Sequence, residues 1–147
     1  MDAISLLTAD HNRVRGLFTR FREAHEADDT RTMVEVAGRI FEELEVHTTI
    51  EEEIFYPAFL EATDDKDMHH EAEIEHEGAK NLIAQIEESS PDDEYFDSKV
   101  KVLSEMIKHH VKEEEQPGGM FAEARKSEMD LLTVGQELKA RKEQLEG

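Results

Sequence analysis

The amino-acid sequence predicts an all-α protein: an up-down-up-down four-helix bundle with a short additional C-terminal helix. Apolar residues recur at spacings of three and four along four long segments, which is the pattern of amphipathic helices. The chain has only three prolines and seven glycines, too few for the many turns of a β-sandwich or barrel. Its 147 residues fit one domain, with the bundle over about 2–117 and a connector and helix over about 118–147.

The first predicted helix begins after Asp2, which can act as its N-cap, and extends to about residue 27. His11 lies in the middle of its inner stripe, where leucine would be expected. His25 lies two heptads further on, near the end of the helix, and we assign it no role in a site. The stripe consists of Ile4, Leu7, His11, Val14, Phe18, Phe21 and His25.

The second predicted helix covers about residues 31–62 and carries a histidine and a carboxylate one turn apart. His47 and Glu51 are four residues apart, so both point inward from one face. Glu52 and Glu53 fall outside this face, which predicts solvated charges.

Two expectations concern the last turns of this helix: which residues point inward, and where the helix bends. Ile54 and Ala58 continue the two inner lines of the helix. Pro57 lacks a backbone N–H group, so we expect a kink in the last turn.

The third predicted helix covers about residues 66–88, with His76 on its inner line. The boundary that follows is the clearest in the chain. Ser90 can cap the fourth helix, with Pro91 at the first helical position.

The fourth predicted helix carries His110 and Glu114 inward, again one turn apart. It is expected to end at Pro117-Gly118-Gly119. Residues 120–126 are predicted to form a connector, after which Ser127 can cap a short amphipathic helix.

Together the four helices bring six potential metal ligands to the core. A single core histidine is usually just hydrogen-bonded, and a single His-x-x-x-Glu pair is common by chance. Six such groups buried together would be costly unless something joined them, so the pattern predicts a metal site. The six residues are His11, His47, Glu51, His76, His110 and Glu114.

The ligand types narrow the choice of metal. Imidazole and carboxylate groups suit iron, manganese or zinc, and the chain has no cysteine to supply thiolate. A structural zinc site needs only four ligands and rarely draws six groups from four helices. Two carboxylates at matching places in two half-repeats can bridge two ions. A non-haem di-iron centre is the simplest interpretation, with zinc or manganese as alternatives.

At this point the chain resembles the hemerythrin-like HHE cation-binding domains. The matching motifs are Asp10-His11, His47-x-x-x-Glu51 followed by Phe55-Tyr56-Pro57, Glu75-His76, His110-x-x-x-Glu114 and the continuation over residues 120–126. The resemblance implies a carboxylate-bridged pair of iron ions that also share an oxo or hydroxo group. It further implies that His11 and His47 serve one iron, His76 and His110 the other, and that Glu51 and Glu114 bridge.

One position departs from the family pattern. Oxygen-carrying hemerythrins have a second histidine four residues before the one in the third helix, and this chain has Ala72 there. Glu73 and His69 are candidates for an additional ligand, although both also fit a solvated helix surface, and Tyr56 is a further candidate. About two of roughly twelve coordination positions would stay open, which favours chemistry over simple oxygen carriage.

Charge and composition exclude several classes of function. The net charge of −20 argues against nucleic acid and against an anionic membrane surface as partners. The absence of cysteine excludes disulfides and thiolate chemistry. Neither a signal peptide nor an apolar run of about 18 residues is visible, so we expect a soluble cytoplasmic protein.

The leading hypothesis is a di-iron protein that reacts with a small oxidant (dioxygen, peroxide or nitric oxide) in oxidative or nitrosative stress defence. The alternative is a regulatory protein that reversibly binds dioxygen, or senses iron or oxygen, without turnover. Whether the protein is an enzyme is left open. A ferritin-like carboxylate enzyme is less favoured, because only Glu73 and His76 form a Glu-x-x-His motif at a core position. A metal-free acidic adaptor is a fourth possibility.

Overall fold

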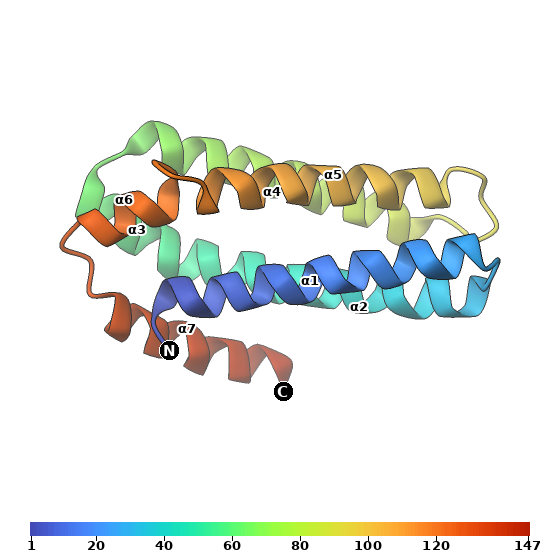
Figure 1. Ribbon diagram of the computed structural model, residues 1–147, viewed down its shortest axis with the longest axis horizontal. Helices are drawn as coiled ribbons and strands as arrows, with labels where there is room; N and C mark the ends of the chain where they lie inside the picture. The colour runs from blue at the N-terminus through green and yellow to red at the C-terminus, as the bar shows by residue number, and fades with distance from the viewer.

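The computed structural model covers residues 1–147 and contains helices joined by short connections, with no strand (Figure 1). The predicted all-helical fold class is therefore confirmed. The elements are α1 (Ala3–Glu26), α2 (Thr30–Ile50), the π-helical segment η1 (Glu51–Phe55), α3 (Tyr56–Thr63), α4 (Lys66–Glu88), α5 (Phe96–Glu115), α6 (Met120–Lys126) and α7 (Leu131–Glu146).

The long helices pack in pairs, α1 along α2 and α4 along α5, while α7 lies on the outer side of α1 and α2 (Figure 1). Gly135 allows α7 to pass very close to the N-terminus. A Cβ atom at Gly135 would lie 2.6 Å from the carbonyl oxygen of Met1. No helix is long and apolar enough to cross a membrane.

Aspartate side chains begin four of the helices. Each accepts a hydrogen bond from the backbone N–H three residues on, which satisfies a donor that the helix itself cannot pair. Asp2 was predicted to do this and does so, with Ser5 as donor. The other three caps are Asp29, Asp65 and Asp130.

The predicted start of the fourth helix was wrong. Helix α5 begins at Phe96, not at Ser90 and Pro91. The side chain of Asp93 accepts the backbone N–H of Tyr95, a local turn that competes with helix formation. The first helical residue, Phe96, is a buried aromatic that fixes the start of α5 in the core.

The predicted connector over residues 120–126 is also corrected, because it forms the helix α6. Met120, Phe121 and Ala124 are buried along one side of it. Ser127 closes α6 instead of opening the next helix, and its hydroxyl donates to the carbonyl of Ala124.

The second helix is interrupted where the sequence predicted continuity. Over η1 the backbone hydrogen bonds join residues five apart instead of four, which makes a π-helical turn. Such a turn holds extra backbone and rotates the residues after it. Phe55, Tyr56 and Phe59 are therefore buried, whereas the predicted inward residues Ile54 and Ala58 are only half-buried. Pro57 stands in the first turn of α3, directly after η1.

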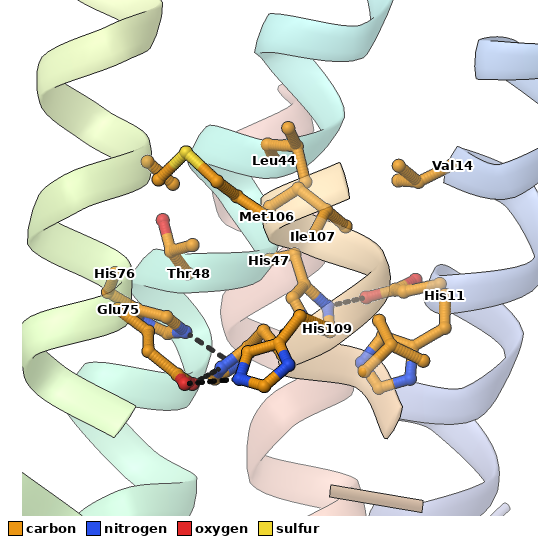
Figure 2. Close-up of a pocket in the computed structure, with 14 residues that line it drawn as sticks. His11, Val14, Leu44, His47, Thr48, Glu75, His76, Met106, Ile107 and His109 are labelled. Carbon is orange, nitrogen blue, oxygen red and sulfur yellow. Dashed lines mark hydrogen bonds and ion pairs between the residues drawn. The ribbon is translucent and has the colours of Figure 1, made fainter. Parts of the chain in front are cut away.

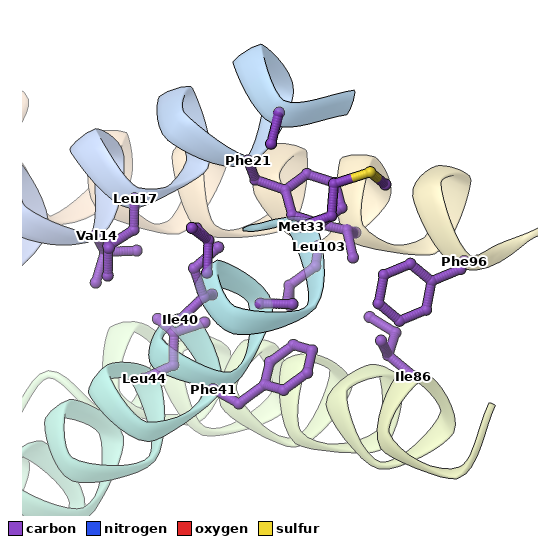
Figure 3. Close-up of a cluster of buried hydrophobic side chains, with 14 of the residues drawn as sticks. Val14, Leu17, Phe21, Met33, Ile40, Phe41, Leu44, Ile86, Phe96 and Leu103 are labelled. Atoms are coloured by element: carbon purple, nitrogen blue, oxygen red, sulfur yellow. The ribbon is translucent and has the colours of Figure 1, made fainter. Parts of the chain in front are cut away.

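Two apolar clusters make up the core. The first, shown in Figure 3, fills the bundle around Ile40 and Leu103. The second surrounds Phe55, Phe59 and Leu138 and includes the inner side of α7. The polar residues predicted to bind metal lie between them: along α2, Leu44 belongs to the first cluster and Ile50 to the second, with His47 in between.

Candidate metal centre

The structure brings all six predicted ligands together in the interior. Each is at most 7% exposed, and Glu51 is completely buried. They come from α1, α2, η1, α4 and α5, so every long helix contributes one histidine. The residues are His11, His47, Glu51, His76, His110 and Glu114.

One group of four donors comprises His11, His47, Glu51 and Glu114, whose ligand atoms all lie within 4.8 Å of one another. Nε2 of His47 is 3.1 Å from Oε1 of Glu51. Nε2 of His11 is 3.2 Å from Oε1 of Glu114. This spacing suits coordination of a single ion by all four side chains.

A second group lies directly beside the first and shares its carboxylates. It contains His76, His110 and Glu51. Nε2 of His76 is 3.2 Å from the same Oε1 of Glu51 that faces the first group. Oε2 of Glu114 is 3.3 Å from Nε2 of His110. Each glutamate thus lies between one histidine of the first group and one of the second: Glu51 between His47 and His76, and Glu114 between His11 and His110.

Tyr56 belongs to the second group by geometry. Its Oη–H donates to Oε2 of Glu114 at 2.9 Å, and Oη lies 3.0 Å from Nε2 of His76 and 3.2 Å from Nε2 of His110. Burial and the carboxylates of Glu114 and Glu51 raise the pKa of the Tyr56 phenol well above its usual value. The π-helical turn explains why helical facing alone did not place this residue among the leading candidates.

The other candidates for an additional ligand lie outside both groups. Nδ1 of His69 is 3.0 Å from Oε1 of Glu73, whose side chain is 54% exposed. The imidazole of His69 instead contacts the ring of Tyr56 edge-on. Ala72 is buried in the second apolar cluster.

Each of the four histidines also pairs through Nδ1 with a carboxylate outside the two groups. An Nδ1–H donated to a carboxylate leaves Nε2 free to bind a metal and fixes the orientation of the ring. The pairs are His47 with Asp10 at 2.9 Å, His76 with Glu52 at 2.8 Å, His110 with Glu75 at 2.5 Å and His11 with Glu115 at 2.6 Å.

These outer carboxylates were missed by the sequence reasoning, and the interpretation of Glu52 as a solvated charge was wrong. The reason is that each pairs with a histidine on another helix, which one helical wheel cannot show. A signal was present, however. Every outer carboxylate is the direct sequence neighbour of a predicted ligand, as in Asp10-His11 and Glu51-Glu52.

Two of the outer carboxylates are themselves held by lysines. Lys80 Nζ donates to Oε1 of Glu52 at 2.7 Å. Lys142, from α7, donates to Oδ1 of Asp10. Burial opposes ionisation of Asp10, but its hydrogen bonds with His47 and Lys142 hold its pKa well below the usual range.

The pKa shifts describe a cluster that holds protons in the absence of metal. Burial opposes charge on His47, but the carboxylates of Glu51 and Asp10 outweigh it and raise the pKa of His47 to about 10. Burial likewise opposes charge on Glu51, yet His47 and His76 hold the pKa of that carboxyl well below its usual value. A cation can replace these protons, since it satisfies the same carboxylates and imidazoles.

Several atoms of the cluster lack any hydrogen-bond partner, which would be costly for buried polar groups. They are Nε2 of His11, Nε2 of His47, both carboxylate oxygens of Glu51 and Oε1 of Glu114. Their nitrogen and oxygen lone pairs converge, so the donor set fits metal ions that accept imidazole and carboxylate.

A cavity of about 120 Å³ adjoins the histidines (Figure 2). His11, His47, His76 and His110 border it on one side. The remaining wall is largely apolar and includes Val14, Leu44, Met106, Ile107 and Val111. This space can take a molecule of a few heavy atoms.

Residues 2–117 match the family model of the hemerythrin HHE cation-binding domain. The chain belongs to this family. Among solved structures, a hemerythrin HHE cation-binding domain-containing protein from Mycobacterium kansasii has the same fold, with a TM-score of 0.75 and 21% identity. That similarity covers 99% of this chain and 87% of the M. kansasii chain. The resemblance seen in the sequence is confirmed.

A curated relative is larger than this HHE chain. It is a DNA nickase from Nostoc sp. strain PCC 7120, 30% identical over 118 residues. The match covers 78% of this chain but only 32% of the Nostoc protein. The two proteins therefore share a region of this size, within a much longer relative.

Proposed function

We propose that this HHE protein holds two iron ions and reacts with a small oxidant, either dioxygen, peroxide or nitric oxide, in oxidative or nitrosative stress defence. The observation that carries the proposal is the shared position of Glu51 and Glu114 between two pairs of histidines. His11 and His47 would hold one ion and His76 and His110 the other. Iron is proposed over zinc because the proposed reactions need a redox ion, and manganese, which accepts the same imidazole and carboxylate donors, is the alternative.

When bound, the iron pair would supply the redox chemistry. The protein's own contribution begins with the outer carboxylates, which accept the Nδ1–H groups and so keep each Nε2 directed inward. Tyr56 carries a proton on Oη within hydrogen-bonding distance of the second group, where it can donate to an oxygen or nitrogen atom of a small molecule. The cavity borders the same four histidines, and most of the rest of its wall is apolar, but Tyr56, Glu51 and Glu114 do not line it.

The size and lining of the cavity support the choice of substrate. A volume of about 120 Å³ with a largely apolar wall fits dioxygen, nitric oxide or hydrogen peroxide and leaves little room for a larger organic substrate. Because Tyr56 stands near the position left by Ala72, it is the proposed additional protein group at the second ion.

The proposal treats residues 1–147 as one hemerythrin-like domain, with α1, α2, α4 and α5 in up-down-up-down order. Packing of α1 along α2 and of α4 along α5 supports this order. Packing of α7 onto α1 supports a single domain. We also propose a cytoplasmic location, since dioxygen, peroxide and nitric oxide all reach that compartment.

A second candidate function, reversible dioxygen binding or iron and oxygen sensing without turnover, is favoured by one observation. Lys142 on α7 donates to Asp10, and Asp10 in turn contacts His47. A change in the position of His47 can therefore shift α7, which lies on the outside of the bundle. DNA cleavage is not carried over from the Nostoc relative. The net charge of −20 does not suit a nucleic-acid partner.

The test is metal analysis and an optical spectrum of freshly purified protein, followed by turnover assays with peroxide and with nitric oxide. We expect about two irons per chain, an absorption spectrum of a bridged di-iron centre and measurable turnover. Tightly held zinc, with no iron uptake after reconstitution, would refute the di-iron assignment. Full iron content without turnover, but with reversible dioxygen binding, would favour the second candidate.

A further inference from the structure

A groove of about 620 Å³ lies between α1 and α5 and adjoins the small cavity beside the histidines, with which it shares His11, Val14, Ile107 and Val111. It follows the line along which these two helices face each other (Figure 1). His11 stands at one end of it and His25 at the other.

Two contacts between α1 and α5, one near each end of the groove, show how the helices are aligned. At one end Nδ1 of His11 is 2.6 Å from Oε2 of Glu115. At the other end Nε2 of His25 is 2.8 Å from Oδ2 of Asp97. The two helices are therefore antiparallel. His25 follows His11 by fourteen residue steps, which makes the groove about 21 Å long at 1.5 Å per residue. His25, to which the sequence assigned no role, is thus a terminal contact of this groove.

The floor of the groove is apolar. Val14, Phe18 and Phe21 line it from α1, and Ile107 and Val111 line it from α5. Phe18 and Ile107 are only half-buried. The alignment of the helices places both near the middle of the groove, where they offer an apolar surface to a ligand.

The rim has the opposite charge balance to the rest of the protein. It carries four basic residues, Arg15, Arg22, Lys101 and Lys108, and two acidic ones. The whole chain has 17 basic residues against 37 acidic ones. The antiparallel alignment places Arg22 opposite Lys101 and Arg15 opposite Lys108, so like charges face each other across the groove. The lysine and arginine ion pairs of the structure use other residues, namely Arg13, Lys80, Arg141 and Lys142.

We propose that this groove binds a long-chain carboxylate, with the acyl chain on the apolar floor and the carboxylate between Arg22 and Lys101. An extended peptide would need backbone partners, which α-helical walls do not offer. An acyl chain needs none. An anion between Arg22 and Lys101 also relieves the repulsion of two facing cations.

The place of the carboxylate sets the direction of the ligand. Arg22 and Lys101 lie towards the His25 end of the groove, where Asp97 is paired with His25 and Glu105 stands one turn from Lys101 on α5. At the other end His11 contacts the carboxylates of Glu114 and Glu115, which do not line the groove. From Arg22 the chain would extend towards His11, over eleven residues or about 16 Å of helix.

The proposal is tested by calorimetric titration of the purified, metal-loaded protein with palmitate below its aggregation concentration. We expect saturable binding of one palmitate per chain. Octanoate, which covers only part of the floor, should bind much more weakly. The double variant Arg22→Gln/Lys101→Gln should weaken palmitate binding about tenfold, since two exposed charge contacts are lost. Phe18→Ser should also weaken it, with no change in metal content.

The matched control is Arg20→Gln/Lys99→Gln, which removes two charges from the same helices outside the groove. It should bind palmitate like the parent protein. Equal weakening in both double variants would overturn the proposal, because net charge alone would then explain it. Absence of saturable palmitate binding would also overturn it. So would binding to phosphatidylserine vesicles without binding of free palmitate, which would indicate a membrane surface instead. The titration is repeated on metal-free protein, which should bind palmitate equally, so the groove and the di-iron assignment can fail separately.

Discussion

Lys142 donates a hydrogen bond to Oδ1 of Asp10, and the other oxygen of that buried carboxylate lies 2.9 Å from Nδ1 of His47. A residue near the C-terminus is thereby connected through one side chain to a predicted metal ligand on α2. Lys142 lies beyond the residues 2–117 that match the HHE family model. Helix α7 therefore holds the carboxylate that orients His47, one of the predicted ligands.

Replacement of this lysine should loosen metal at the His11 and His47 side. Without Lys142 the carboxylate of Asp10 loses a charged partner and holds His47 less firmly, so Lys142→Met should speed transfer of iron to a chelator about threefold to tenfold. Lys142→Arg should restore the parent rate. The control is Arg141→Met, which breaks the ion pair of α7 with Glu53 and a hydrogen bond to Gln144 within α7, but leaves Asp10 and Lys142 in place. Equal acceleration by both methionine variants would mean that docking of α7, not its contact with Asp10, matters.

Loss of the outer carboxylate of His76 should weaken metal binding more directly. In Glu52→Gln the side chain keeps its size but can no longer pair a full negative charge with Nδ1–H of His76. We expect about 10- to 100-fold lower affinity for the ion on that side, measured by competition with a coloured chelator. The matched control is Glu73→Gln, an exposed glutamate on α4 that contacts only His69. Unchanged affinity in Glu52→Gln would restore the sequence-based interpretation of Glu52 as a solvated charge.

The sequence was sufficient to place His11, His47, His76 and His110 in one buried site because helical periodicity reports the facing of residues within one helix. It could not pair Glu52 with His76 or Asp10 with Lys142, since these contacts depend on the distance and rotation between helices. The tautomer of each histidine depends on the same contacts between helices, so the sequence pattern could not predict it.

The inward direction of the Tyr56 side chain could not be predicted from helical periodicity either. A regular helix through Glu51 would have directed Ile54 and Ala58 inward. The π-helical turn η1 rotates the residues that follow it about the helix axis, so Phe55 and Tyr56 point inward instead. Nothing in the local sequence except the nearby Pro57 marks this irregularity, and a proline more often signals a kink than a π-helical turn.

The dependence of stability on pH should have opposite directions with and without metal. In the metal-free protein the folded pKa of His47 is raised from 6.5 to about 10. Its stabilisation is therefore fully present below pH 6.5 and is lost as pH rises towards 10. The lowered pKa of Glu51 gives stability above about pH 4.5 that is lost in acid. Metal takes the place of the histidine protons, so the metal-loaded protein should lose stability mainly as pH falls. Melting temperatures of both forms across this range are the measurement. A metal-free melting temperature that is constant from pH 6.5 to 10 would contradict the prediction.

Reduction of the cavity should discriminate between substrates of different size. A Cβ atom at Gly78 would lie 3.2 Å from Cε of Met106, a residue of the cavity wall. Gly78→Ala should push Met106 towards the cavity and slow reaction with peroxide more than with the smaller nitric oxide. Gly38→Ala is the control, because a Cβ atom at Gly38 meets nothing within 4 Å. Identical rates in the two variants for both substrates would exclude this cavity as the route or binding space.

The last prediction is that Tyr56 limits the space for a histidine side chain at residue 72. Ala72 stands one turn before His76 on α4, where oxygen carriers have a histidine, and it is buried with Tyr56 in the same apolar cluster. Because Oη of Tyr56 lies 3.0 Å from Nε2 of His76, it already occupies the side of the site that a new imidazole at residue 72 would enter.

Ala72→His alone should therefore overpack the site and cost about 1–3 kcal/mol of stability. Ala72→His/Tyr56→Phe removes the competing hydroxyl and should recover part of that loss. In this double variant the added histidine should close an open position, so peroxide or nitric oxide turnover should fall and reversible dioxygen binding should become easier to detect. Metal content and melting temperature are measured first, then turnover and dioxygen binding. If Tyr56→Phe and the double variant keep their iron and match the parent in turnover, neither the phenol nor the missing histidine determines the reactivity of this centre.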